Sequence, residues 1–249
     1  MERTYIFKQC SVSTNTELKE AVRLASGQVW DVVCADSQTG GRGRRGNAFF
    51  SPAGGLYFSA AYPLGDRAGN VPFLTLLAGL AAAETLDRYG AETLIKWPND
   101  LYLHNKKLCG ILTELVSFPA GSTAVVGVGL NLSLKKEDLP PQLRETVTSL
   151  LMENVPLPDR DTLIREIVSR LDTFVYEENA LLGTSVYADR INKRAYLTDK
   201  RVKTVSDGAH YWGTVKGVAP DGSLVILENT GQIRRIYSGT VNCQLKIKN

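Results

Sequence analysis

The pattern of apolar residues changes near residue 197, and this change limits the folds that the chain can adopt. Beyond it, short segments alternate apolar and polar residues, and turns containing glycine separate them, which is typical of antiparallel strands. The expected strands are 201–206, 211–218, 223–228, 232–237 and 240–246. About fifty residues of this kind form a small barrel or sandwich. We therefore expect a small β domain at 198–249, after a larger domain at 1–197.

The first 197 residues mix the two kinds of secondary structure. Apolar residues at helical spacing predict helices over 14–26, 73–89 and 159–182. Apolar runs rich in β-formers predict strands over 29–35, 56–62, 94–97, 108–116 and 123–132. This irregular order favours an α+β fold, with a mixed sheet flanked by helices, over a regular β-α-β alternation.

Composition excludes several classes of protein. The 249 residues are 43% hydrophobic and 22% charged, which is ordinary for a globular chain and not for a disordered or coiled-coil one. A net charge of +3 is too small for a protein that coats nucleic acid or an anionic membrane. Neither an export signal nor a membrane-spanning run is visible, and the four cysteines form no C-x-x-C pair. We therefore expect a cytoplasmic protein with reduced thiols and without structural zinc.

The positive charge is concentrated in the glycine-rich segment 40–46. No acidic residue lies between Asp36 and Asp66, and the three arginines in that interval carry as much charge as the whole chain. Alternating glycines let the backbone approach a ligand, while arginines donate forked hydrogen bonds to phosphate or carboxylate. The segment also matches G-x-G-x-x-G, but residues 47–55 cannot form the helix that dinucleotide binding requires. Taken alone, a solvated loop explains this run equally well.

Two further segments place polar groups at the ends of strands. A strand stopped by Pro98 presents Asn99 and Asp100, which suit a base edge, a hydroxyl group or a hydrated magnesium ion. Lys107 stands at the start of an apolar strand, where a cation can neutralise developing phosphate charge. An ordinary turn and a solvated hairpin lysine are the alternatives.

Glycines at alternate positions mark the strand that contains Gly127 and Gly129. They leave one face of the strand bare, so that a flat ligand can lie against it with Asn131 at its rim. Close packing between strand and helix explains these glycines equally well. Near the start of the chain, a cap for the first helix is expected within Ser11-Val12-Ser13-Thr14-Asn15, a role that needs no further function.

Taken together and in order, these segments resemble the biotin protein ligases. The resemblance runs from about Ser11 to the C-terminus, and it rests on Ser13-Thr14-Asn15, Gln38 ahead of Gly41-Arg42-Gly43-Arg44-Arg45-Gly46, Lys96-Trp97-Pro98-Asn99-Asp100-Leu101, Lys107-Leu108-x-Gly110-Ile111-Leu112 and Gly127-x-Gly129-x-Asn131. It implies a biotin/lipoate ligase-like catalytic domain followed by an SH3-like β-barrel. It also implies a two-step reaction: biotin and ATP form biotinyl-5′-AMP, and a lysine of a biotin carboxyl carrier protein domain, part of a biotin-dependent carboxylase, accepts the biotinyl group. Both partners of the first step are anions, which agrees with the concentrated positive charge.

The resemblance also implies a role for each matching residue. Biotin would contact Ser13, Thr14, Asn15, Gln38, Arg42, Gly43, Arg44, Lys107, Gly110, Gly127 and Gly129. ATP and the adenylate would contact Arg42, Arg44, Arg45, Phe49, Asn99, Asp100, Lys107 and Asn131. The catalytic residues would be Lys107, Arg44 and Arg42. Magnesium is implied as well, without an assigned set of ligands.

The sequence departs from the family pattern at two positions. Phe49 stands where many relatives place a tryptophan over the adenine, and Cys109 occupies the middle of the Lys-Leu-x-Gly motif. In addition, Ser13 lies so near the start that we expect no DNA-binding helix-turn-helix domain, and hence a monofunctional ligase with no DNA or membrane partner. The choice between monomer and homodimer stays open.

Two alternative functions belong to different classes. A lipoate or octanoate transferase shares the fold but binds an apolar acyl chain without a ureido head group, and the glycine-arginine and Lys96–Leu101 segments favour biotin over it. A module that binds single-stranded nucleic acid would also combine a basic loop with a small β domain. The low net charge and the lack of aromatic residues between the arginines argue against that module.

Overall fold

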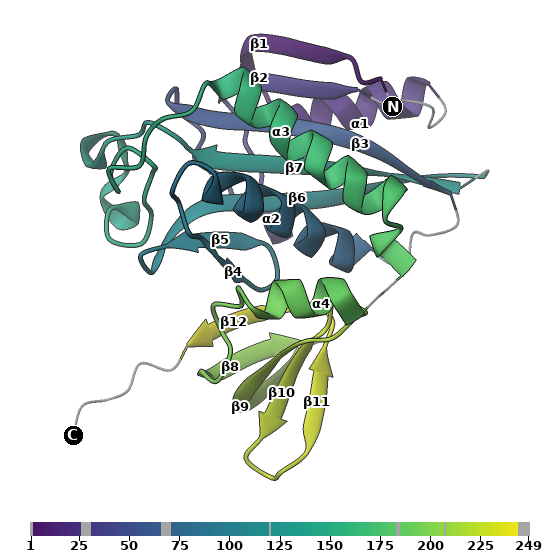
Figure 1. Cartoon of the computed structure of the whole chain (residues 1–249), viewed down its shortest axis with the longest axis vertical. Coiled ribbons are helices and arrows are strands. Elements are labelled where there is room, and N and C mark those ends of the chain that lie inside the picture. The colour runs from purple at the N-terminus through teal and green to yellow at the C-terminus, as the bar shows by residue number, and fades with distance from the viewer. Residues whose placement is uncertain are drawn as a thin grey trace.

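The structure is a computed structural model that describes residues 2–25, 31–65, 71–119, 121–182, 185–206 and 208–243. Parts of three expected elements, at residues 26, 29–30 and 244–246, lie outside the described residues. None of the helices in these ranges has the length and apolar character needed to cross a membrane. Figure 1 shows a large sheet covered by helices, with a smaller sheet beside it.

The larger sheet has seven strands within the described residues, in the order β1-β2-β3-β7-β6-β5-β4. Only β1 and β2 pair in parallel, and the other neighbours are antiparallel. The strands are β1 (Tyr5–Ser11), β2 (Val32–Gln38), β3 (Gly55–Gly65), β4 (Leu94–Lys96), β5 (Asp100–Leu103), β6 (Lys106–Phe118) and β7 (Gly121–Asn131). The predicted mixed sheet is therefore confirmed.

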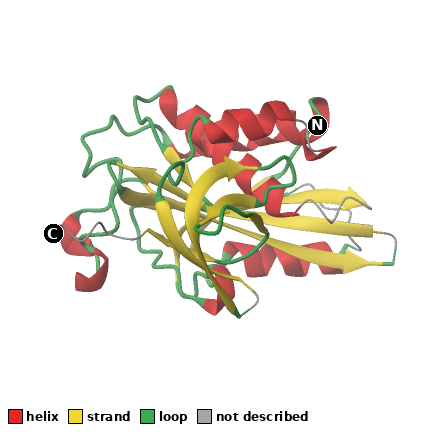
Figure 2. Cartoon of the chain, turned by 90° about the horizontal axis from the view of Figure 1, so that it is seen from below, coloured by secondary structure: helices red, strands yellow, loops and turns green. Residues whose placement is uncertain are grey.

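Helices cover both faces of this sheet, as Figure 2 shows. Helix α1 (Thr14–Leu24) is capped by Ser13, whose Oγ accepts a hydrogen bond from Thr16 N, so the cap expected within residues 11–15 is confirmed. Its buried face packs on one side of the sheet through Leu18 and Val22. Helices α2 (Val71–Asp87) and α3 (Arg160–Asp172) cover the other side, and α2 is buried almost all round because α3 packs against it.

The smaller sheet is antiparallel, with five strands in the order β11-β10-β9-β8-β12. Helix α4 (Ser185–Asn192) leads into β8 (Arg201–Ser206), β9 (Ala209–Val218), β10 (Leu224–Glu228), β11 (Ile233–Ile236) and β12 (Thr240–Cys243). Its buried valines and leucines belong to the same apolar cluster as the α2 side of the large sheet. Trp97 Nε1 also donates a hydrogen bond of 2.9 Å to Gly222 O. These contacts hold the small sheet against the strand ends of the large one.

Three differences from the sequence-based expectation have physical causes. The helix expected over 159–182 ends at Asp172, continues as a π-helical turn (Thr173–Glu177) and stops before Asn179, which adopts a left-handed φ of 51°. Strand β1 was not predicted because most of its side chains are exposed and do not alternate. Strand β5 and helix α4 were also missed, since Pro98-Asn99 indicates a turn and α4 has only eight residues.

Candidate active site

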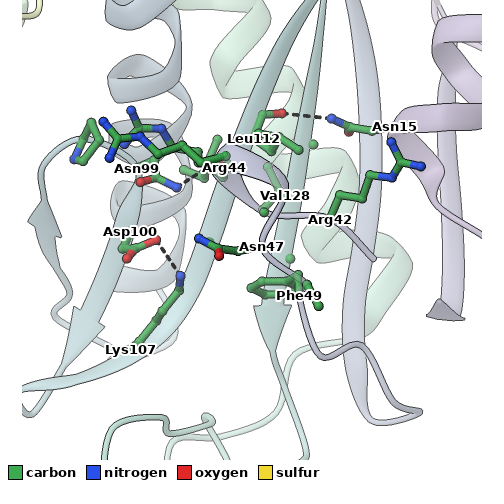
Figure 3. Close-up of a pocket in the computed structure, with 18 of the residues that line it drawn as sticks. Asn15, Arg42, Arg44, Asn47, Phe49, Asn99, Asp100, Lys107, Leu112 and Val128 are labelled. Atoms are coloured by element: carbon green, nitrogen blue, oxygen red, sulfur yellow. Dashed lines mark hydrogen bonds and ion pairs between the residues drawn. The ribbon is translucent and has the colours of Figure 1, made fainter. Parts of the chain in front are cut away.

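Segments that are far apart in the sequence meet in one pocket of about 290 Å³ (Figure 3). They are the start of α1, the glycine-arginine loop after β2, the β4–β5 turn, parts of β6 and β7, and the turn before β12 with the first three residues of that strand. Among the predicted site residues, those that line the pocket are Ser13, Thr14, Asn15, Gln38, Arg42, Gly43, Arg44, Arg45, Phe49, Asn99, Asp100, Lys107, Gly110, Gly127 and Gly129.

One end of the pocket is a network of neutral polar side chains. Gln38 Nε2 donates to Ser51 Oγ at 3.0 Å, and Gln38 Oε1 accepts from Thr14 N at 2.9 Å. The fully buried Ser59 on β3 places its Oγ 2.7 Å from Thr14 Oγ1 and 2.6 Å from Asn15 Oδ1. Because each group has a partner of fixed polarity, the amides cannot turn freely. This end therefore presents oriented donors and acceptors to a neutral polar ligand.

The glycines of β6 and β7 make room for side chains that cross the sheet. Gly110 and Gly129 are cross-strand neighbours, and the ring of Phe49 lies over both: a Cβ on Gly129 would stand 2.4 Å from this ring. A Cβ on Gly127 would stand 2.0 Å from Asn15 Oδ1. The bare face expected from the sequence is therefore partly covered by Phe49 and Asn15, which approach too closely for a Cβ at Gly129 or Gly127 unless these side chains move.

The other end of the pocket is cationic. Lys107 Nζ lies 2.7 Å from Asp100 Oδ1 and 5.6 Å from the centre of the Phe49 ring. The backbone of Lys107 is held by a 2.8 Å hydrogen bond from its N to Thr146 O. Within the described lining, Asp100 is the only carboxylate, whereas several cations are present. The pocket is thus suited to anionic groups at this end.

The glycine-arginine loop reaches from the large sheet to the turn before β12. Arg44 Nη1 donates to Gly239 O at 3.4 Å, and Arg45 Nη1 donates to Thr240 Oγ1 at 2.9 Å. Burial lowers the pKa of the Arg44 guanidinium, and the neighbouring charge of Arg45 lowers it further. An anion placed beside Arg44 would relieve this cost of burying charge.

Residues 7–131 match the biotin/lipoate A/B protein ligase family, and residues 199–242 match the biotin protein ligase C-terminal domain. The bifunctional ligase/repressor BirA of Escherichia coli is 34% identical over 239 residues, which cover 92% of this chain and 71% of BirA. The chain belongs to the biotin/lipoate A/B protein ligase family.

Solved structures agree with this assignment. The biotin protein ligase of Aquifex aeolicus, in complex with biotin and ATP, superposes with a TM-score of 0.78 at 26% identity, covering 97% of this chain and 99% of that one. A biotin–(acetyl-CoA-carboxylase) ligase of Mycobacterium tuberculosis is 37% identical over 174 residues, which cover 64% of this chain and 60% of that protein. The predicted family and fold class are thereby confirmed.

One predicted site residue of this family member lies outside the pocket lining. Asn131 is buried at the end of β7, and its Nδ2 donates to Thr148 O at 2.9 Å. The amide nitrogen therefore holds the segment that follows the site. Asn99 also uses its amide internally, donating to Ile111 O at 2.9 Å, but it does line the pocket.

Several lining residues were not predicted. They are Asn47, Ala48, Lys96, Trp97, Pro98, Ile111, Leu112, Val128 and residues 239–242, where the turn before β12 ends and the strand begins. Asn47 and Lys96 stand inside or beside predicted motifs, so proximity in the sequence could have indicated them. The turn could not have been found in this way, because Arg44 and Gly239 are 195 positions apart.

The described residues contain no group of three His, Cys, Asp or Glu side chains able to hold a metal ion by themselves. Magnesium, however, commonly uses one or two carboxylates together with substrate phosphates. Asp100 is a carboxylate at the cationic end and fits this arrangement.

Proposed function

We propose that this chain is a biotin protein ligase, which joins biotin to ATP as biotinyl-5′-AMP and transfers the biotinyl group to a lysine of a biotin carboxyl carrier protein domain. The observation that carries the proposal is the polarity of this pocket: oriented amides and hydroxyls at one end, and Lys107 with Arg44 at the other, while Arg42 lies beside Asn15 (Figure 3). A neutral ureido ring needs the first environment, and two reacting anions need the second.

In the first step, a carboxylate oxygen of biotin attacks the α-phosphorus of ATP, and the bond to pyrophosphate breaks. Lys107 neutralises the carboxylate and the α-phosphate together, so that the anions can approach each other. Arg42 and Arg44 stabilise the additional charge that develops on the phosphate oxygens. The residues thus act by position and charge, and the step requires no proton transfer.

In the second step, the neutral amine of the acceptor lysine attacks the biotinyl carbonyl carbon, and AMP leaves with the electrons of the broken C–O bond. The attacking nitrogen then loses its proton. Because a mixed anhydride is already a good electrophile, no strongly basic side chain is needed, and the described pocket lining contains no histidine.

The proposal distributes the predicted residues along the pocket. The biotin ring lies near Ser13, Thr14, Asn15, Gln38 and the glycines of β6 and β7, below Gly43. Arg45, Asn99 and Asp100 face the nucleotide. Asp100 would hold a magnesium ion, which would neutralise phosphate charge. Phe49 contacts the adenylate near its phosphate, since its ring is close to Lys107. Asn131 supports the site from outside the lining.

The acceptor in this proposal is a carrier domain of a biotin-dependent carboxylase in the cytoplasm. We include neither DNA nor a membrane among the partners, because the net charge of +3 is too small for general binding to polyanions. The lipoate alternative is disfavoured by the polar end, since oriented amides would face an apolar dithiolane ring without partners.

The experiment that tests the proposal is a pyrophosphate-release assay with biotin, ATP and magnesium. Transfer to a purified carrier domain is then followed by mass spectrometry. We expect pyrophosphate release that depends on biotin, and a mass increase on the carrier domain. Calorimetric titration that detected lipoate binding and no biotin binding would reverse the assignment.

A further inference from the structure

An ion pair lies next to the polar end of the pocket, in contact with Asn15. Lys19 on α1 places its Nζ 2.5 Å from Glu114 Oε1 on β6, and the two side chains are only 14% and 28% exposed. The second carboxylate oxygen, Glu114 Oε2, accepts a hydrogen bond of 2.9 Å from Asn15 Nδ2. Neither charged residue lines the pocket, yet the pair contacts a residue that does.

This pair determines which way the Asn15 amide faces. Asn15 Nδ2 donates to Leu112 O at 3.1 Å as well as to Glu114, and neither a carbonyl nor an ionised carboxylate can donate in return. Figure 3 shows the bond to Leu112. The nitrogen must therefore stay on that side, and Oδ1 lies on the other, directly over Gly127. The pocket receives an acceptor here and not a donor.

The surroundings keep Glu114 ionised. Burial by itself raises the pKa of this carboxyl group, but hydrogen bonds from Lys19 and Asn15, with the charges of Lys19 and Arg42, lower it overall. The Glu114 carboxylate is also attracted by the positive charge of Arg42 in the glycine-arginine loop. Glu114 is thus an anion that is held from several sides.

We propose that Glu114, anchored by Lys19, is a positioning residue that fixes Asn15 Oδ1 as the acceptor for a ureido N–H of biotin. The inference rests on the proposed function, because it assigns this end of the pocket to the ureido ring. It predicts that the polarity of Glu114, and not merely its volume, determines how well biotin binds.

The variant Glu114→Gln tests this polarity. The Lys19 ammonium attracts the oxygen of the new amide, so the amide nitrogen faces Asn15 Nδ2 and a donor meets a donor. Asn15 Nδ2 then either stays on Leu112 O with a second donor facing it, or turns toward the pocket and gives up the Leu112 bond. We expect the KM for biotin in the pyrophosphate-release assay to rise about tenfold, with little change in the KM for ATP or in kcat.

Removing Lys19 in the same variant provides the decisive comparison. In Lys19→Met/Glu114→Gln the glutamine is free to present its oxygen to Asn15, so the KM for biotin should return to within about threefold of wild type. A purely structural defect would become worse when a second contact is lost. Lys19→Met alone leaves the carboxylate bond to Asn15 in place, and should raise the KM no more than about threefold.

Glu17→Gln is the matched control. Glu17 forms a similar pair, 2.6 Å from Lys8 Nζ, and accepts from Ser11 Oγ at 2.7 Å, but it makes no bond to Asn15. We expect this variant to keep the wild-type KM for biotin. If it raised the KM as much as Glu114→Gln does, the effect would not depend on Asn15 and the inference would be overturned.

The results separate the inference from the proposed function. Wild-type protein that releases no pyrophosphate in response to biotin contradicts the proposed function itself. Wild-type protein that is active, with an unchanged KM for biotin in Glu114→Gln or with no recovery in the double variant, overturns only the role of Glu114. Should Glu114→Gln fail to fold, Glu114→Met takes its place, because it removes the acceptor for Asn15 Nδ2 and keeps a side chain of similar length. An unchanged KM for biotin in that variant would overturn the role of Glu114.

Discussion

Adding one methyl group at Gly127 or at Gly129 should have very different effects, although both glycines lie on β7 and line the same pocket. Neither has a left-handed φ, so the backbone at both positions is open to alanine. At Gly127 the new Cβ would stand 2.0 Å from Asn15 Oδ1, and at Gly129 it would stand 2.4 Å from the Phe49 ring. What differs is whether the neighbour can move.

The cost can be worked out from the partners of each neighbour. To reach an ordinary contact of 3.4 Å, Asn15 Oδ1 must move by about 1.4 Å. Moving the whole amide breaks the bond that Oδ1 accepts from Ser59 and the bonds that Nδ2 donates to Leu112 and Glu114. At about 1 kcal/mol each, we expect Gly127→Ala to destabilise the protein by about 2–3 kcal/mol. The half-buried Phe49 ring must move about 1 Å and breaks no side-chain hydrogen bond, so Gly129→Ala should cost less than about 1 kcal/mol.

Thermal unfolding and calorimetric titration with biotin measure both consequences. For a chain of this size, the Gly127→Ala cost corresponds to a Tm lower by about 5–10 °C, and biotin affinity should be lost with the Asn15 acceptor. Replacing glycine with alanine also lowers the conformational entropy of the unfolded chain, which stabilises the folded protein. This gain is the same at both positions and cancels when the two variants are compared. Equal Tm values for the two variants, with biotin affinity unchanged in Gly127→Ala, would refute the reasoning.

Three further predictions concern charge, thiols and pH. Lys107→Met should lower the rate of pyrophosphate release at least about 100-fold while the Tm stays near that of wild type. The control variant Lys106→Met, at the neighbouring position, should keep the wild-type rate. Equal losses of rate in both variants would contradict the proposed role of Lys107. Iodoacetamide should label the exposed Cys10 and Cys243 in the native protein but not the buried Cys34 or Cys109, because burial raises the pKa of both buried thiols to about 12. Mass spectrometry should therefore count two additions before denaturation and four after it. The folded state lowers the pKa of Glu114 and of Glu17 below the ordinary value of 4.5. Both carboxylates therefore contribute fully to the free energy of unfolding above pH 4.5, and this contribution is lost as the pH falls through their lowered pKa values. Urea unfolding should show the free energy of unfolding decreasing in this range, and an increase toward pH 3 would contradict the prediction.

Most of the fold could be predicted because its elements carry local patterns. Strands β6 and β7 contain long apolar runs, and the buried helix α2 is rich in alanine and leucine. Strand β1 lacks such a pattern because, as the edge strand of the sheet, it leaves most of its side chains in solvent. The overlong helix prediction has a related cause: apolar spacing continues through the π-helical turn, and spacing alone does not show where the backbone leaves the α conformation.

The site residues that could be predicted are those that lie together in short sequence motifs. Glycine alternation, an arginine run and a strand end with Asn99 and Asp100 are local features, and all of them face the pocket. Groups that reach the site from distant segments carry no local pattern. The partners Lys19 and Glu114 are 95 positions apart, and Arg45 and Thr240 are 195 positions apart, so only the fold brings each pair together.

The cationic end suits a reaction between anions because its charges are held by partners that substrates can replace or share. Arg44 and Arg45 donate to a carbonyl and a hydroxyl, which are weaker acceptors than phosphate, so both arginines gain by turning to the nucleotide. Lys107 has three hydrogen atoms to donate, and Asp100 takes one of them. The remaining two can bind a carboxylate oxygen and an α-phosphate oxygen at the same time. One lysine can therefore hold both reacting groups without giving up the carboxylate that fixes its position.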